Sequence, residues 1–213
     1  MKIEVKANAI LFTAVTLLML SACVSTSEYE SMVAERDVAA AQRDAAEAQR
    51  DLLASQKAEL EAAFDDLNEL LAEEIQANKL TLRELVDGVE VEIPSDVLFR
   101  SGAALPTVSD DARDEFFKLA GYLSDTDFFI AVVGHTDSQQ PTPRLAERYP
   151  TNWELGGARA AVAARFLERE GVDPNRITAN SRGEHVPVAS NASAEGRARN
   201  RRIQIILRVL PEG

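Results

Sequence analysis

The sequence of 213 residues contains one cysteine, one tryptophan and no apolar run long enough to span a membrane. A lone cysteine forms no disulfide within its own chain, and no set of cysteines and histidines has the spacing of a zinc site. The net charge of −12 disfavours binding to nucleic acids, whose backbone attracts basic surfaces. These shortages exclude a disulfide scaffold, argue against a metal centre and a nucleic-acid-binding role, and leave no sign of a cofactor.

A short apolar run near the start, from Ala9 to Leu20, follows the basic residues Lys2 and Lys6. A membrane-spanning helix needs about 20 apolar residues, whereas the apolar core of a secretory signal peptide has roughly 7–15. Small residues follow the run, as they do before a signal-peptide cleavage site. We therefore expect residues 1–22 to form an export signal peptide.

The motif LSAC, from Leu20 to Cys23, resembles the lipobox of bacterial lipoproteins, in which the cysteine becomes acylated. The resemblance implies that residues 23–27 form a lipid-anchored N-terminus, held in a bilayer by about 0.8 kcal/mol per buried methylene group. Val24 stands where inner-membrane lipoproteins commonly have Asp, so the same resemblance favours the outer membrane. The alternative is that Cys23 is incidental and ends an ordinary signal peptide or membrane anchor.

Proline and glycine are both absent from residues 27–87, and apolar residues recur there at every seventh position. A period of seven keeps one row of side chains on one helix face, which is typical of a coiled coil. We predict a helix over residues 28–78 that pairs with other copies, loosely near its start and more firmly from Leu53 to Leu71. The alternative is a single solvated helix, held by pairs of Arg with Asp or Glu. The apolar row consists of Met32, Ala39, Ala46, Leu53, Leu60 and Leu67.

Negative charge is concentrated in this same stretch. Residues 27–88 contain 6 Lys and Arg against 16 Asp and Glu, whereas residues 89–213 contain 15 against 18. Such an excess of one sign indicates a solvated surface. We therefore expect an acidic stalk, joined through a linker at residues 79–88 to a C-terminal domain over residues 89–213.

From Val89 onward, the pattern changes to alternating strands and helices. Capped, amphipathic patterns predict a helix that begins at Ser109, another over residues 152–170 with Asn152 as its cap, and a short one over residues 193–200. This order is typical of an α/β sandwich in which helices cover a sheet. Period-two alternation or a short apolar run predicts the strands, at residues 89–93, 128–135, 176–181 and 201–210.

Three motifs of this domain resemble the OmpA-like peptidoglycan-binding domain, and together they lie within residues 85–210. They are VVGHTD, NWELGGARAAVAARFL and GEHVPVASNASAEGRARNRRIQIIL. The proline-containing loop between the first two resembles that of the MotB branch, whose members are flagellar stator proteins. The resemblance implies a small mixed sheet with helices on one face. One departure is Gly156, because many relatives have Ser at this position.

Through the same resemblance, the domain is expected to bind diaminopimelate in the stem peptide of peptidoglycan. That group ends in one ammonium and one carboxylate on a single carbon, so its receptor needs an anion beside a cation. The resemblance assigns the ammonium to Asp137 and the carboxylate to Arg159, whose planar fork matches a carboxylate better than Lys does. The alternative is a plain structural salt bridge between Asp137 and Arg159. Further candidates are Thr136 and Asn152 as supports and, around the cleft, Ser101 in the loop 99–102 and Asn200 and Arg202 in the run 200–202.

Residues near these motifs allow other interpretations, which the sequence supports less well. His135 and His185 lack a third ligand at the spacing of a metal site. His135, Asp137 and Ser138 are the residue types of a Ser–His–Asp triad, but they are too crowded along the chain to form its relay. We therefore expect no metal and no catalysis. Trp153 is expected to pack in the core, and the alternative is that it stacks on a ligand.

The leading hypothesis is a non-catalytic lipoprotein of the outer membrane that faces the periplasm, tethers this membrane to peptidoglycan and forms a homo-oligomer through its stalk. The alternative, from the MotB likeness, is an ion-driven stator subunit. A stator needs a membrane span with an ion-carrying carboxylate, and the run from Ala9 to Leu20 is short and contains no Asp or Glu. A cell-wall hydrolase, a third hypothesis, lacks a credible catalytic set.

Overall fold

The computed structural model describes residues 25–99, 108–110 and 113–209. The chain divides into two compact units, Met1–Ala54 and Ser55–Gly213. The predicted signal peptide, Cys23 and Ser101 lie outside the described residues. In the described part of the chain, no helix combines the length and the apolar character that a membrane crossing requires.

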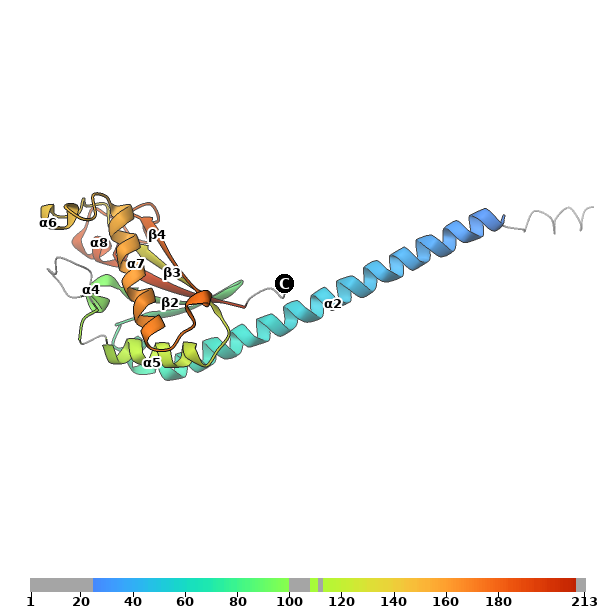
Figure 1. Ribbon diagram of the computed structural model, residues 1–213, viewed down its shortest axis with the longest axis horizontal. Coiled ribbons are helices and arrows are strands. Elements are labelled where there is room, and N and C mark those ends of the chain that lie inside the picture. The colour runs from blue at the N-terminus through green and yellow to red at the C-terminus, as the bar shows by residue number, and fades with distance from the viewer. Residues whose placement is uncertain (1–24, 100–107, 111–112, 210–213) are drawn as a thin grey trace, which may run out of the picture. The chain divides into compact units, whose positions relative to one another are not determined.

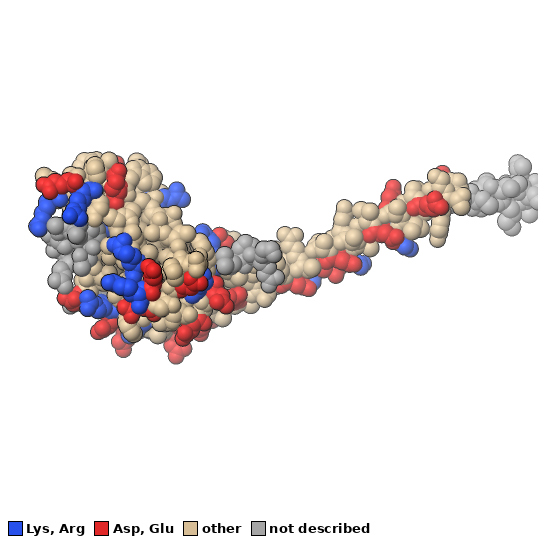
Figure 2. All heavy atoms as spheres, in the orientation of Figure 1, with Lys and Arg blue, Asp and Glu red and all other residues tan. Residues whose placement is uncertain are grey.

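A long helix, α2 (Thr26–Leu70), begins in the first unit (Figure 1). In that unit the apolar row faces solvent, since Met32 is 50% and Leu53 57% exposed. Acidic side chains follow one another along this part of the helix (Figure 2). Exposed ion pairs contribute about 0–1 kcal/mol each to stability. The stability of this helix therefore comes more from its alanine-rich composition. The ion pairs, at 2.8–2.9 Å, are Arg36–Asp37, Arg43–Asp44 and Arg50–Asp51.

The last part of α2 belongs to the second unit and has different surroundings. Leu60, Ala63 and Leu67 are at most 8% exposed, and Leu71, just after the helix, is fully buried. All four side chains join the core of their own chain. The predicted firm pairing from Leu53 to Leu71 is therefore wrong from Leu60 onward, because this row is already covered by its own domain.

The single helix predicted over residues 28–78 is interrupted near its end. α2 stops at Leu70, and a short helix, α3 (Ala72–Gln76), follows it. Glu74 of α3 is buried and accepts a hydrogen bond from Lys118 at 2.9 Å. Asn78 then adopts a φ of 55°, a left-handed conformation that Asn tolerates better than most residues and that ends a helix.

The segment predicted as a linker, residues 79–88, contains a strand. β1 (Thr81–Leu85) pairs antiparallel with β2 (Gly88–Pro94). Arg83 lies opposite Glu90 in this pairing, with 3.6 Å between the guanidinium and the carboxylate. The linker prediction is wrong here because a short strand is stabilised by its cross-strand pairs, which its own sequence does not show.

The helix predicted to begin at Ser109 is described from Arg113, as α5 (Arg113–Ser124). Ser109 Oγ donates to the carbonyl of Val97 at 2.8 Å. The hydroxyl therefore ties the segment before α5 to a short helix, α4 (Ser95–Leu98).

The second unit contains a five-stranded mixed sheet with the order β1-β2-β5-β3-β4. β3 (Phe129–His135) and β4 (Ile177–Gly183) run parallel, and β5 (Arg202–Arg208) pairs antiparallel with β2 and β3. The predicted α/β fold, with a small mixed sheet and covering helices, is confirmed (Figure 1). The remaining helices are α6 (Pro143–Ala146), α7 (Asn152–Arg169), η1 (Pro174–Arg176) and α8 (Ala194–Asn200).

One face of the sheet carries the hydrophobic core. Apolar residues alternate with polar ones along β2 and β5, and Val91 lies opposite Ile205, both fully buried. Helices α5 and α7 contribute to the same core, with the rings of Phe116 and Phe166 in contact at 5.0 Å between centroids. Because side chains alternate along a strand, the other face carries the charged residues of these strands, among them Glu90, Glu92 and Arg202.

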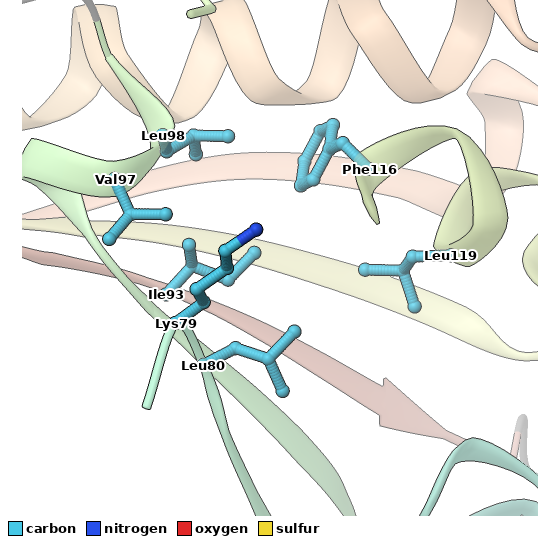
Figure 3. Close-up of a pocket in the computed structure, with 7 residues that line it drawn as sticks. All are labelled: Lys79, Leu80, Ile93, Val97, Leu98, Phe116 and Leu119. Carbon is cyan, nitrogen blue, oxygen red and sulfur yellow. The ribbon is translucent and has the colours of Figure 1, made fainter. Parts of the chain in front are cut away.

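A small cavity lies within this core between β2, α4 and α5 (Figure 3). Its volume is about 20 Å³. A water molecule needs roughly 10–15 Å³ of such space, so the cavity has room for about one water and none for a ligand. The residues that line it are Lys79, Leu80, Ile93, Val97, Leu98, Phe116 and Leu119.

Candidate functional site

The predicted site lies where β3 ends and α7 begins. The backbone N–H of Thr136, just after β3, donates to the carbonyl of Gly183 at 2.9 Å. Helix α7 approaches the sheet closely through glycines, since a Cβ on Gly134 would lie 2.0 Å from the carbonyl oxygen of Gly156. A Cβ on Gly156 would lie 2.5 Å from Ser181 Oγ. Gly156, where many relatives have Ser, thus sets the distance between α7 and the end of β3.

Asp137 is the second residue after β3 and is 7% exposed. Its Oδ2 accepts from Nη1 of Arg201 at 2.8 Å, and its Oδ1 accepts from the backbone N–H of Gln139 at 3.0 Å. Nη2 of Arg201 donates to Asp96 Oδ2 at 2.6 Å, so one guanidinium holds two carboxylates. These charge-assisted bonds, the one to Asp96 most of all, raise the pKa of Arg201.

Arg201 lies within the run 200–202 that the resemblance places around the cleft, but only its neighbours Asn200 and Arg202 were singled out as candidates. Successive residues at the start of a strand point to opposite faces of the sheet, so only one of two adjacent arginines can reach Asp137. The pair of arginines was a signal, but the sequence does not show which one faces the site. Arg202 lies on the other face, with its Nε 2.9 Å from Glu92 Oε2.

Asn200 is fully buried and organises the loop before α8. Its Oδ1 accepts from the N–H groups of Val188 and Ala189 at 2.8 and 2.9 Å, and its Nδ2 donates to Asn191 Oδ1 at 2.8 Å. Asn191 Oδ1 also accepts from the N–H of Ser138 at 3.3 Å. Asn200 therefore contacts the segment beside the site through Asn191.

The guanidinium of Arg159 differs from that of Arg201 in its contacts. Among the described residues, Nη1 of Arg159 is buried and has no hydrogen-bond acceptor, while its guanidinium carbon lies 5.9 Å from the ring centroid of Phe99. Burial lowers the pKa of Arg159, an effect that the charges of Asp96 and Asp137 oppose. The plain salt bridge between Asp137 and Arg159 is not formed, because Asp137 pairs with Arg201. A buried cationic donor without an acceptor is costly, so it suits an anion that arrives with a ligand.

The two predicted supports, Asn152 and Thr136, are 4% and 3% exposed. Nδ2 of Asn152 donates to the carbonyls of Asp137 and Gln139 at 3.2 and 3.0 Å and to the carboxylate of Glu184. Asn152 thereby fixes the backbone of Asp137 and so helps to position its carboxylate. In the described part of the chain, Thr136 Oγ1 is buried without a partner, so it can serve a ligand.

The start of α7 differs from the prediction in two respects. Thr151 rather than Asn152 caps the helix, because its Oγ1 accepts from the N–H of Trp153 at 3.2 Å and Glu154 completes a capping box. Trp153, expected in the core, is 49% exposed and packs on the ring of His185 at 5.1 Å between centroids. That prediction is wrong because the buried side of this first turn is taken by Asn152.

His135 is buried at the end of β3. Its Nε2 lies 2.6 Å from Gln204 Oε1, and Gln204 Nε2 donates to Glu90 Oε2 at 2.9 Å. Because the amide nitrogen faces Glu90, its oxygen faces His135, and Nε2 of the ring carries the proton. Burial, reinforced by the charge of Arg202, lowers the pKa of His135 to about 4. The ring is therefore neutral at pH 7. Among the described residues, no three His, Cys, Asp or Glu side chains group as a metal site requires.

Comparisons with known proteins concern the same region. Residues 99–201 match the OmpA family. The chain is 29% identical over 161 residues to motility protein B of Bacillus subtilis, an alignment that covers 73% of this chain and 58% of that protein. It is also 29% identical over 138 residues to the probable lipoprotein YiaD of Escherichia coli, with 64% of this chain and 59% of that protein covered. The chain thus spans less than two thirds of the length of each relative.

A solved structure extends these matches to the fold. The cell wall anchor of the T6SS from Pseudomonas aeruginosa is 38% identical in sequence and has a TM-score of 0.60, over 68% of this chain and 97% of that structure. The motifs around Asp137 and Arg159, the mixed sheet that carries them and this structural match agree. The chain belongs to the OmpA family.

Proposed function

We propose that this protein binds peptidoglycan through the diaminopimelate of its stem peptides and, without catalysing a reaction, tethers the outer membrane to the cell wall. The observation that carries the proposal is the pair of opposite charges beside the end of β3. Asp137 supplies an anion, and Arg159 supplies a cation whose Nη1 is buried with no acceptor among the described residues. A free amino-acid head, with one ammonium and one carboxylate, is complementary to this pair.

The contact with Arg201 leaves room for an ammonium on Asp137. A carboxylate offers about four lone-pair sites, and the described contacts of Asp137 occupy one on each oxygen, through Arg201 and the N–H of Gln139. Arg201 orients the carboxylate, while Asn152 holds the backbone around it. Arg159 then takes the carboxylate of the ligand.

The roles of the other candidates follow from their contacts. Thr136 Oγ1 is available to the ligand. Asn200 and Arg202 support the loop and the sheet around the site. Ser101 stays a prediction.

The membrane anchor is the second part of the proposal. The LSAC motif supports acylation of Cys23, and the likeness to a probable lipoprotein supports the same anchor. The chain would then sit in the outer membrane and face the periplasm. The exposed apolar row from Met32 to Leu53 supports self-association of the stalk, confined to the part of α2 before Leu60.

A second candidate function is an ion-driven stator subunit, favoured by the likeness to motility protein B. The two candidates differ at Cys23, because only the lipoprotein requires acyl chains there. Metabolic labelling with a fatty-acid analogue separates them. We expect label on the wild type and none on Cys23→Ala. Equal labelling of the two, or no label on either, would contradict the lipoprotein anchor and favour the stator.

The site itself is tested by pull-down of the full chain on purified peptidoglycan. Losing one partner of a desolvated charged contact typically costs about 2–5 kcal/mol, or roughly 30- to 4,000-fold in affinity. We expect losses in this range for both Asp137→Ala and Arg159→Ala. Peptidoglycan whose stem peptide carries lysine, which lacks the distal carboxylate, is the ligand control and should bind the wild type poorly.

Thermal melting of the same variants separates a binding role from a structural one. Nη1 of Arg159 has no hydrogen bond to lose among the described residues, so Arg159→Ala should leave the melting temperature unchanged or raise it. Binding at wild-type strength by Arg159→Ala would show that this arginine is not the carboxylate clamp, and the receptor proposal would fail.

A further inference from the structure

Trp153, the only tryptophan of the chain, is 49% exposed. Tryptophan is highly buried on average in folded proteins, so its position on the surface calls for a reason. Its indole lies against the imidazole of His185, with 5.1 Å between the centroids and 32° between the planes. We name this pair of rings the aromatic platform.

The aromatic platform is built on the segments that carry the candidate site. Trp153 follows Asn152, whose amide holds the carbonyls of Asp137 and Gln139. His185 follows Glu184, whose carboxylate accepts from the same amide. Asn152 therefore connects both rings to the backbone of Asp137. The capping box at the start of α7 fixes the backbone of Trp153, so the platform is in place before a ligand arrives.

We propose that the aromatic platform of Trp153 and His185 packs against a sugar ring of the peptidoglycan glycan strand, beside the stem-peptide site. The inference rests on the proposed function and deepens it. Pyranose rings have apolar C–H faces edged by hydroxyl groups. An indole matches them, since it offers a flat apolar surface together with one N–H donor.

Trp153 of the platform and Arg159 of the charge pair are both carried by α7. Trp153 and Arg159 are six positions apart on α7, which is about 9 Å along the helix axis at 1.5 Å per residue. The diaminopimelate is the third residue of a stem peptide whose first residue is joined to the glycan. Three extended residues span about 10 Å. Six positions also turn the helix by about 600°, so Trp153 and Arg159 project about 120° apart, and a stem peptide that joins them has to bend around the start of α7.

The surroundings of the platform favour a sugar over a protein partner. Docking surfaces for proteins normally have a contiguous apolar centre. Here Glu184, a charged residue, adjoins His185 in sequence, and the exposed apolar neighbours further along that loop are only Val186 and Val188. An aromatic side chain beside polar groups is a common feature of sites that orient a small ligand.

The single tryptophan makes the proposal directly measurable. Purified full chain is titrated with the free diaminopimelate tripeptide and with the same tripeptide attached to its disaccharide. We expect the disaccharide form to bind roughly threefold to tenfold more tightly, as an aromatic contact contributes. We also expect that only the disaccharide form shifts the tryptophan emission to shorter wavelength, because only its sugar covers the indole.

Three variants, measured by calorimetry, complete the test. Trp153→Ala should bind the tripeptide as the wild type does and lose the advantage of the disaccharide form, while Trp153→Phe should keep most of that advantage. Phe117→Ala is the matched control, since Phe117 is an aromatic residue of α5 that is 58% exposed; it should behave like the wild type.

Equal affinities of the wild type for the two ligands, or an advantage that survives in Trp153→Ala, would overturn the sugar platform alone. An emission spectrum that neither ligand changes would do the same. Absence of binding to both ligands would overturn the peptidoglycan proposal and the platform with it.

Discussion

The two parts of α2 carry one heptad row in opposite surroundings. Met32 and Leu53, in the first unit, are at least half exposed, whereas Leu60 and Leu67, in the second, are at most 8% exposed. The spacing of the row is the same in both parts. A heptad row therefore shows which face of a helix is apolar, and it does not show whether another copy or the same chain covers that face.

Charged residues differ between the two units in the same way. The side chains of Arg43 and Asp44, in the first unit, are 69% and 66% exposed, whereas those of Arg201 and Asp137 are 26% and 10% exposed. Water competes for an exposed pair and its net contribution is small. Removing one partner of a buried pair leaves a charge without compensation. Burial, more than the number of ion pairs, decides which charges matter to stability.

The largest expected effect tests the contrast along α2. Leu67→Ala removes a fully buried side chain and should lower the free energy of unfolding by about 2–5 kcal/mol. Leu53→Ala, at an exposed position, should change it by less than about 0.5 kcal/mol. Urea unfolding of both variants at low protein concentration gives the comparison. Equal effects would show that the two parts of α2 do not differ as described.

His135 sharpens the contrast, because a buried titratable group makes stability depend on pH. Its pKa of about 4 in the folded state lies below the ordinary value of 6.5. His135 thus binds a proton more readily in the unfolded chain than in the folded one. The stability that comes from keeping His135 neutral is complete above about pH 6.5 and is lost as the pH falls towards about 4. The loss should approach ~3 kcal/mol.

The measurement is urea unfolding at a series of pH values from about 7.5 to 4.5, across this window. His135→Gln should lack the part of the pH dependence that His135 contributes. His185→Gln, at the other histidine of the chain, is the control and should retain it. The same pH dependence in wild type and His135→Gln would refute the assignment.

The smallest expected effect compares two arginines. Arg201→Ala leaves Asp137 with one hydrogen bond fewer and should destabilise the protein by about 1–3 kcal/mol. Arg43→Ala, in the exposed helix, should cost about 0–1 kcal/mol. Unfolding in low and high salt distinguishes them further, because salt screens the exposed pair more strongly than the buried one. A larger loss for Arg43→Ala would reverse the comparison.

At the candidate site, the resemblance carried by the sequence motifs could propose Asp137, Arg159, Asn152 and Thr136. It could not show that Asp137 pairs with Arg201. That contact joins residues 64 positions apart, and it depends on which of two adjacent arginines faces the sheet edge. The exposure of Trp153 could not be predicted for a similar reason, because its neighbour Asn152 occupies the buried side of α7.

The sequence by itself determined the main helices and strands of the second unit. β3, α7 and β5 lie where apolar periodicity and turn residues placed them, because these signals act between residues close along the chain. Only the tertiary structure decided what each surface meets. The segment expected to be a linker forms β1 because it pairs with β2, and the last leucines of α2 are buried in the core. The tertiary structure also left Nη1 of Arg159 without an acceptor among the described residues. Pairing, burial and charge compensation depend on residues far apart in sequence, and folding brings these together.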